Sequence, residues 1–131
     1  MDSESSHFES ALTIRLVEEA FLKLFSEGEV NGTVHTSVGQ ELSALAFAGQ
    51  LYSDDFVISN HRCHGHFIAF TKEIEGLIAE LMGKKSGVCG GVGGSQHLNF
   101  GNFFSNGIQG GMTPFATGLA QSIVLNGNDS I

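Results

Sequence analysis

Five residues whose side chains can bind ligands or move protons crowd into the stretch SNHRCHGHFIAF at positions 59–70. They are His61, Arg62, Cys63, His64 and His66. Imidazole and thiolate groups are good zinc ligands, whereas an arginine beside imidazole N–H groups can hold a phosphate. Histidines that merely pack at the start of a helix would need no ligand. The stretch therefore predicts a metal site, a phosphate site or ordinary packing.

The phosphate interpretation fits the neighbouring sequence better than the metal interpretation. Closed zinc sites usually combine two separated ligand pairs, and neither Cys63 nor Cys89 belongs to a C-x-x-C pair. Residues 56–59, FVIS, form a short apolar and β-branched run that is typical of a buried strand. Ligands bind at the carboxyl ends of strands in parallel α/β sheets, which is where His61 and Arg62 would lie.

A second unusual segment is rich in glycine yet also apolar. Ten of the 29 residues from 83 to 111 are glycine, but large apolar side chains are interspersed among them, unlike a Gly/Ser linker. The segment matches neither the P-loop pattern nor G-x-G-x-x-G. It can present bare amides and carbonyls to a flat ligand, or serve as a purely structural loop. His97, inside it, is a candidate acid or base, or a residue that packs the loop.

Helices are expected to position these two segments. Ser6 and Glu9 have the spacing of a capping box, and apolar residues then recur every three or four positions up to Gly28, which predicts a first helix. Thr113 and Pro114 are a typical N-cap and first helical residue for a last helix. Helices are predicted at residues 39–51, 67–70, 73–82 and 113–126.

Composition limits the class of protein. A length of 131 residues suits one domain or part of one. A net charge of −8 argues against nucleic-acid binding, and no apolar run approaches the roughly 20 residues of a bilayer crossing. No Lys or Arg precedes Arg15, unlike a signal or transit peptide, so we expect a cytoplasmic protein with two reduced thiols.

Four ordered segments carry a family resemblance. The segments VHTSVGQE, SNHRCHGH, MGKKSGVCGGVGGSQHL and SNGIQGGMTPFATGLA resemble the alpha subunit of the thiamine-diphosphate-dependent 2-oxo acid dehydrogenases, the decarboxylating components of the pyruvate, branched-chain and acetoin dehydrogenase complexes. The resemblance runs from about Ile14 to the last residue. It implies an α/β thiamine-diphosphate-binding fold, a parallel sheet flanked by helices. Residues 1–131 would be its N-terminal part and residues 83–112 its Gly-rich cofactor loop.

The resemblance also implies roles for five residues. His61 and Arg62 match an aromatic-plus-arginine pair, often Tyr-Arg, that hydrogen-bonds the diphosphate. Gly107 and Gln109 match positions whose backbone groups contact the aminopyrimidine ring. His97 matches the histidine of a Ser-x-His motif that lines the substrate channel and orients intermediates, so it is the implied catalytic residue.

The implied activity is oxidative decarboxylation of a 2-oxo acid such as pyruvate, with acyl transfer to lipoamide. The implied cofactors are thiamine diphosphate and Mg²⁺, and the implied partners are a beta subunit in an α2β2 assembly and the lipoyl domain of the acyltransferase. Family members continue into a Gly-Asp-Gly motif and a later Asn that hold the Mg²⁺, whereas this sequence ends at Ile131. Residues 130–131 read as the start of a further strand, so we expect a truncated chain that is inactive alone.

Two other interpretations remain open. The chain could be a non-catalytic interaction module that keeps the fold without the cofactor chemistry, or a His/Cys metal-binding protein. An incomplete fold would also expose apolar surface, so we expect self-association or marginal stability.

Overall fold

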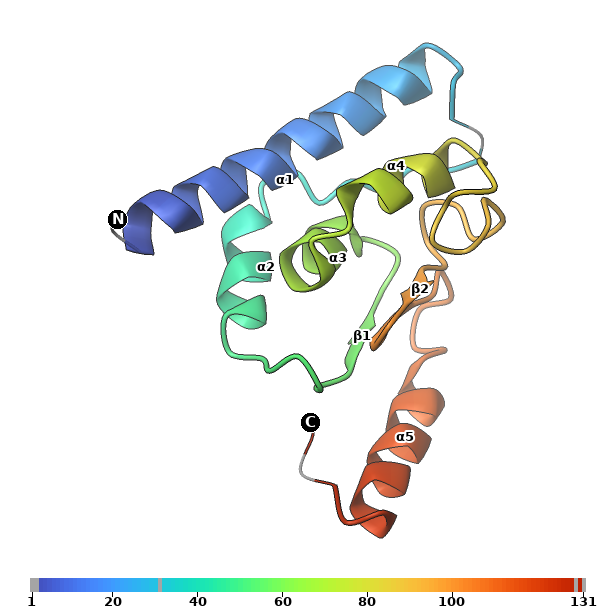
Figure 1. Ribbon diagram of the computed structural model, residues 1–131. Coiled ribbons are helices and arrows are strands. Elements are labelled where there is room, and N and C mark those ends of the chain that lie inside the picture. The colour runs from blue at the N-terminus through green and yellow to red at the C-terminus, as the bar shows by residue number, and fades with distance from the viewer. Residues whose placement is uncertain (1–2, 31, 129, 131) are drawn as a thin grey trace.

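The computed structural model describes residues 3–30, 32–128 and 130. Within them, five helices are combined with three short strands, which is compatible with part of an α/β protein (Figure 1). In chain order the elements are α1 (Ser3–Ser26), α2 (Glu41–Ala48), β1 (Val57–Ser59), α3 (His64–Thr71), α4 (Ile74–Leu81), β2 (Asn99–Phe100), β3 (Phe103–Ser105) and α5 (Thr113–Leu125).

The three strands form one small mixed sheet in the order β1-β3-β2. Strands β1 and β3 are parallel, with Ser59 opposite Ser105, while β2 pairs antiparallel with β3. A two-residue turn joins β2 to β3, and Gly101 at its first position has φ +56°, which this kind of turn favours for glycine. The expected parallel pairing is therefore present in the β1–β3 pair. The β2–β3 hairpin was not predicted, because a two-residue strand leaves no alternation in the sequence.

The buried core contains residues of the sheet and of the helices α1 to α4. Phe21 of α1, Phe67 of α3 and Phe103 of β3 are fully buried. The rings of Phe67 and Phe103 meet edge to face, with centroids 5.1 Å apart. Complete burial of one such side chain contributes about 1.5–3 kcal/mol. These rings fix α3 against β3 and so set where the chain leaves both parallel strands.

The ends of α1 confirm one part of the sequence prediction and correct another. The helix begins one turn before Ser6, so the predicted capping box at Ser6 and Glu9 is wrong: the polar residues ahead of Ser6 continue the helix. At the other end, Gly28 has φ +77°, as predicted for a C-terminal cap. The N–H groups of Gly28 and Glu29 donate to carbonyls of the last turn at 3.1 and 3.0 Å.

Two further helix boundaries differ from prediction. Helix α2 is shorter than residues 39–51, because Gly39 has φ +89° and cannot belong to it. Helix α3 begins at His64 rather than Phe67, so part of the histidine cluster forms its first turn. The strand predicted at 56–59 and the helix predicted at 73–82 are each present within one residue at either end.

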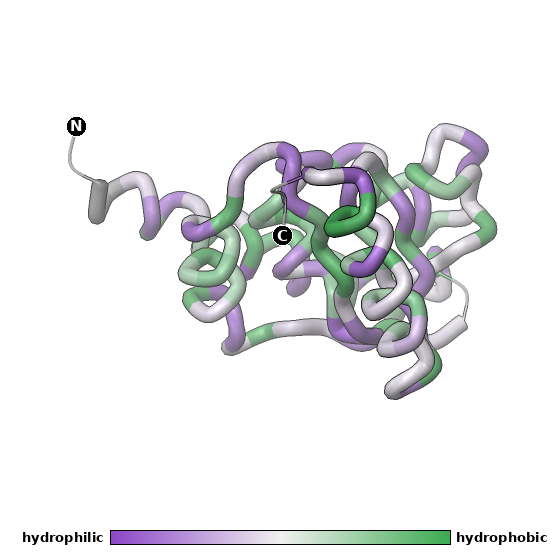
Figure 2. Tube along the Cα trace, turned by 90° about the horizontal axis from the view of Figure 1, so that it is seen from below, coloured by the Kyte–Doolittle hydropathy of each residue, from purple (hydrophilic) through white to green (hydrophobic). Residues whose placement is uncertain are grey.

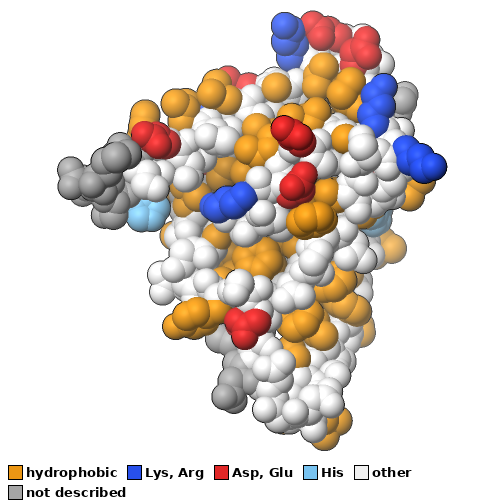
Figure 3. Space-filling view, in the orientation of Figure 1, with side chains coloured by type: hydrophobic (Ala, Val, Ile, Leu, Met, Phe, Trp, Pro, Cys, Tyr) orange, Lys and Arg blue, Asp and Glu red, His pale blue; other side chains and the backbone are white. Residues whose placement is uncertain are grey.

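Helix α5 projects away from the rest of the chain (Figure 1), and none of its residues is buried. Its N-cap is Met112, so the prediction of Thr113 as the cap is wrong by one position, although Pro114 does lie in the first turn. Its apolar side chains include Val124 and Leu125, 71% and 77% exposed, and Figure 3 shows apolar side chains along this helix and along α1.

The described residues nearest the two ends of the chain lie outside the sheet. Seen from below, the N-terminal end of α1 extends beyond the body of the chain (Figure 2). Ser130 is not in a strand, and Ile131 of the predicted final strand lies outside the described residues. In the ranges that the structure describes, no helix combines the length and apolar character that crossing a membrane requires.

Candidate functional site at the carboxyl ends of the parallel strands

The parallel pairing of β1 and β3 brings the two candidate binding segments to one edge of the sheet. Because Ser59 and Ser105 are register partners at the ends of their strands, the residues that follow each strand leave from the same edge. His61 and Arg62 follow β1, while Gly107 and Gln109 follow β3. The backbone thus places the four positions that the sequence suggested for cofactor binding at one edge of the sheet.

The side chain of His61 carries a polar atom with no partner. Its Nδ1 is buried and makes no hydrogen bond within the described residues. The imidazole instead meets the ring of His35 edge to face, with centroids 5.1 Å apart and planes at 82°. A buried polar atom without a partner is costly unless a ligand or water satisfies it. His61 therefore suits contact with a bound polar group.

Arg62 is hydrogen-bonded at its backbone N–H and at one guanidinium nitrogen. Its N–H donates to Oδ1 of Asn60 at 2.8 Å, and one guanidinium nitrogen donates to the carbonyl of Thr36 at 2.6 Å. The residue is exposed, and a guanidinium has five N–H donors in a planar fork that matches phosphate oxygens. The contact with Thr36 orients the group and leaves donors for an anion.

Gly107 and Gln109 lie on the loop between β3 and α5. Within the described residues, neither the Gly107 carbonyl nor the Gln109 N–H is used in a hydrogen bond. A Cβ at position 107 would collide with the side-chain oxygen of Gln96. Gln96 in turn donates from Nε2 to Oγ1 of Thr33 at 3.1 Å. Glycine at 107 thus lets the backbone pass close to Gln96 with its own polar groups still available to a flat ligand.

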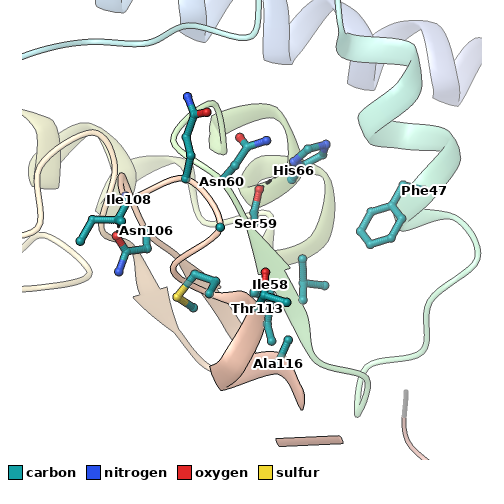
Figure 4. Close-up of a pocket in the computed structure, with 13 residues that line it drawn as sticks. Phe47, Ile58, Ser59, Asn60, His66, Asn106, Ile108, Thr113 and Ala116 are labelled. Atoms are coloured by element: carbon teal, nitrogen blue, oxygen red, sulfur yellow. Dashed lines mark hydrogen bonds between the residues drawn. The ribbon is translucent and has the colours of Figure 1, made fainter. Parts of the chain in front are cut away.

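An open cavity of about 580 Å³ lies beside this loop, between β1 and the first turn of α5 (Figure 4). Apolar and amide side chains from both strand ends line it, including Ile58, Asn106 and Ile108. Within it, the hydroxyl of Ser59 lies 2.9 Å from Nδ1 of His66. Burial lowers the pKa of His66, so this imidazole is neutral at pH 7. The cavity suits an uncharged aromatic group better than an anion.

His97 lies at the same edge of the sheet, but its side chain is exposed and contacts neither His61 nor Arg62. Its backbone N–H donates to the Gly93 carbonyl at 3.3 Å. The next residue, Leu98, donates to Oγ of Ser105 at 2.9 Å and accepts from Ser105 N–H at 2.8 Å. His97 is therefore placed by the pairing that leads into β2, and its side chain is open to solvent.

A buried hydrogen-bond network lies beneath these residues. Glu18 and His64 are both fully buried, and His64 Nδ1 lies 3.0 Å from Glu18 Oε2. The other ring nitrogen lies 3.0 Å from both oxygens of Ser95. Ser37 donates to Glu18 Oε1 from its N–H at 2.9 Å and from its hydroxyl at 2.6 Å. The packing interpretation is thus correct for His64, which ties α1 and α3 to the glycine-rich segment.

The pKa of Glu18 reflects opposing effects. Burial raises this pKa, but hydrogen bonds from His64 and Ser37 together outweigh burial, so the pKa lies below its ordinary value. The carboxylate stays charged and holds its donors. This carboxylate lies beneath the site and is bound by His64 and Ser37.

The two segments that supply the candidate residues contain no acidic side chain, although the chain carries a net charge of −8. No Asp or Glu occurs in residues 56–72 or 81–128, the two segments that build this edge of the sheet. Arg62 therefore meets no carboxylate that belongs to either segment.

The metal interpretation finds no support in the geometry. Among the residues that the structure describes, no group of three or more His, Cys, Asp or Glu side chains is placed to hold an ion. Cys63 is buried, which raises its thiol pKa to about 11, and burial also raises the pKa of Cys89. Both thiols are therefore protonated and poorly reactive at neutral pH.

Sequence reasoning missed three residues that border the site. His35 contacts His61, Thr36 holds Arg62, and Gln96 covers Gly107. The first two belong to the VHTSVGQE segment, which carried a resemblance but no assigned chemistry. The sequence feature that could have identified His35 and Thr36 is a histidine next to hydroxyl residues in a loop that contains glycine.

The chain is similar in sequence to several known proteins. The alpha subunit of acetoin:2,6-dichlorophenolindophenol oxidoreductase from Bacillus subtilis is 39% identical over 116 residues, which are 86% of this chain and 35% of that protein. The mitochondrial pyruvate dehydrogenase E1 component subunit alpha of Schizosaccharomyces pombe is 37% identical over 86% of this chain and 28% of its own length. The Rickettsia bellii pyruvate dehydrogenase E1 component subunit alpha is 35% identical over 95% of this chain and 39% of its own length.

The chain thus spans about a third of the length of these curated relatives. The profile of the family described as "Dehydrogenase E1 component" matches residues 9–131, which include both strand ends and every candidate site residue. The chain belongs to the dehydrogenase E1 component family.

Proposed function

We propose that this chain forms the cofactor-facing N-terminal part of an E1 alpha subunit that decarboxylates a 2-oxo acid such as pyruvate with thiamine diphosphate and passes the acyl group to lipoamide. The observation that carries the proposal is the shared edge of β1 and β3, where the residues after both strands converge. The chain by itself is expected to be inactive, and residues 1–131 with the loop at 83–112 are assigned to the cofactor-binding domain.

Two features of the site fit a diphosphate. The buried Nδ1 of His61 has no partner among the described residues, and the exposed guanidinium of Arg62 uses one donor on Thr36. Both groups lie in segments without Asp or Glu. We assign them to the diphosphate, with Arg62 as its main charge partner.

The aminopyrimidine ring fits the next loop. We assign the free carbonyl of Gly107 and the free N–H of Gln109 to the polar edge of that ring, in keeping with the neutral cavity beside them. The bound cofactor would supply a nucleophilic carbon and would accept the electrons that remain on the substrate when CO₂ departs. This chain's residues would hold and orient it, and the exposed imidazole of His97 would move a proton at the substrate.

The proposed assembly rests on membership of the family rather than on the site geometry. A beta subunit in an α2β2 enzyme would complete the site from the other side, and the lipoyl domain of the acyltransferase would reach it. The described residues offer no ligand cluster for the Mg²⁺ that normally accompanies a diphosphate. We therefore place no metal on the described residues.

Calorimetric titration of thiamine diphosphate with Mg²⁺ into the chain, mixed with an E1 beta subunit, tests the proposal. We expect saturable binding that Arg62→Ala weakens by roughly 10–100-fold, the usual effect of losing a hydrogen bond to a charged group. Lys23→Ala is the matched control, because it removes one exposed positive charge from α1, outside both segments that build the strand edge. Gln109→Val should bind like the wild type, because the assigned contact is made by the backbone.

Three outcomes would contradict the proposal. One is no binding in the presence of the beta subunit, and another is equal affinity of the Arg62→Ala and wild-type chains. The third is capture of the beta subunit with no cofactor uptake, which would instead identify an interaction module.

A further inference from the structure

The glycine-rich segment is built around a buried carboxylate that the proposed mechanism does not use. Glu80, in the last turn of α4, is fully buried. No ion pair among the described residues includes it, so its charge is balanced in another way. An ionised carboxylate in such a place requires several good hydrogen-bond donors.

Four backbone N–H groups supply those donors. Oε2 of Glu80 accepts from Cys89 at 2.7 Å and Gly91 at 2.9 Å, and Oε1 accepts from Gly93 at 2.7 Å and Gly94 at 3.1 Å. Burial raises the pKa of Glu80, but these four bonds outweigh it and keep the pKa below its ordinary value. The loop thus forms an anion-binding nest whose anion belongs to the same chain.

The glycines of the loop are those that this nest requires. Gly91 and Gly94 have φ of +79° and +60°, which turn their N–H groups inward. At Gly87 a Cβ would lie 2.6 Å from Cα of Glu80, and at Gly91 it would lie 2.5 Å from the backbone of Gly83. The loop therefore wraps tightly over the end of α4, and larger residues would push it away.

The nest continues directly into His97. The Gly93 carbonyl accepts the His97 N–H at 3.3 Å, and the Sγ of Cys89 accepts the Asn99 N–H at 3.1 Å. Two of the residues that bind Glu80 are therefore the same residues that hold the chain on either side of Leu98. Movement of the nest would displace His97.

We propose that Glu80 is a positioning residue, whose carboxylate shapes loop 87–94 and thereby sets the place of His97 at the edge of the sheet. The inference rests on the proposed function only where it says that the position of His97 matters for catalysis. The geometric claim stands without any cofactor, so it is tested on the unliganded chain, and its failure would leave the cofactor titration unaffected.

The test is amide hydrogen exchange and NMR on the Glu80→Gln variant. Gln keeps the size of the side chain, but its NH₂ group faces two N–H donors and cannot accept from them. We expect the amides of Cys89, Gly91, Gly93 and Gly94 to exchange roughly tenfold faster or more, with α3 protected as before. The imidazole signals of His97 should shift, while those of the exposed His7 should not.

The matched control is Glu75→Gln, an exposed position on the same helix, which should leave both the loop amides and His97 unchanged. Unchanged loop protection in a folded Glu80→Gln chain would overturn the proposal. Should that variant not fold, acid titration of the wild type replaces it. The four amide signals should then move together through one protonation below pH 4.5, and four signals that do not move together would overturn it.

Discussion

Glu18 and His64 form the fully buried pair beneath the site, and their removal should be costly. In Glu18→Gln, the amide NH₂ must face the donors of Ser37 or of His64, and those donors then lack an acceptor. Breaking one side of such a pair typically lowers the free energy of unfolding by about 3–5 kcal/mol. Urea denaturation measures this loss. The exposed neighbour Glu19→Gln serves as control and should stay within about 0.5 kcal/mol of the wild type. Equal midpoints for both variants would contradict the network.

Glu41 should make the stability of the chain depend on acidic pH. Arg15 donates to its carboxylate at 2.7 and 3.1 Å, and this ion pair lowers the pKa of Glu41 to about 2. A carboxyl with a lowered folded pKa stabilises the protein above its ordinary pKa of 4.5, and this stabilisation is lost as pH falls toward 2. Thermal melts at stepped pH should therefore show a smaller acid loss in Glu41→Gln than in the wild type. Parallel pH profiles would refute this assignment.

At the residue scale, the sequence predicted candidate residues that lie close together along the chain. It did not predict contacts between residues that are far apart in the chain. His61 and Arg62 could be assigned because they directly follow an apolar run. The contact of Arg62 with Thr36 joins residues 26 positions apart, and that of Gln96 with Thr33 joins residues 63 apart. Such pairs depend on how α1 and α3 pack, which periodicity does not encode.

At the scale of elements, α5 should be the least protected helix. None of its residues is buried, and an isolated helix of its 13 residues is marginal in water. We expect its amides to exchange near the rates of an unfolded peptide, while those of α3, which contains the fully buried Phe67, follow global unfolding. Hydrogen exchange followed by mass spectrometry separates the two. Equal protection of α5 and α3 in a monomeric chain would contradict this expectation.

Element prediction succeeded where the pattern was long and failed where it was short. The apolar repeat of α1 and the Thr113-Pro114 start of α5 located these helices closely. The hairpin of β2 and β3 could not be predicted from the sequence, because its strands are two and three residues long and are stabilised by the core around Phe103. The glycine-rich segment was correctly expected to be structured. The carboxylate that structures it, Glu80, lies in the preceding helix.

At the scale of the whole molecule, exposed apolar surface should drive self-association. Phe8, Leu12 and Leu16 recur every four residues on α1 and are at least 44% exposed, and α5 adds Val124 and Leu125. Apolar surface of this extent usually marks an interface. Sedimentation velocity should show species larger than 13.9 kDa that grow with concentration. Replacing Val124 and Leu125 with lysine should reduce them. A monodisperse wild-type monomer at all concentrations would count against this prediction.

The central claim is that residues after both parallel strands contact one cofactor, and residue-resolved NMR tests it most directly. A ¹⁵N-labelled chain, assembled with unlabelled beta subunit, is titrated with thiamine diphosphate and Mg²⁺. We predict saturable shifts at His61 and Arg62 and at Gly107 and Gln109 with one common affinity, while Lys23 on α1 stays unchanged. Shifts confined to one strand end, or none at either, would contradict a shared site at this edge of the sheet.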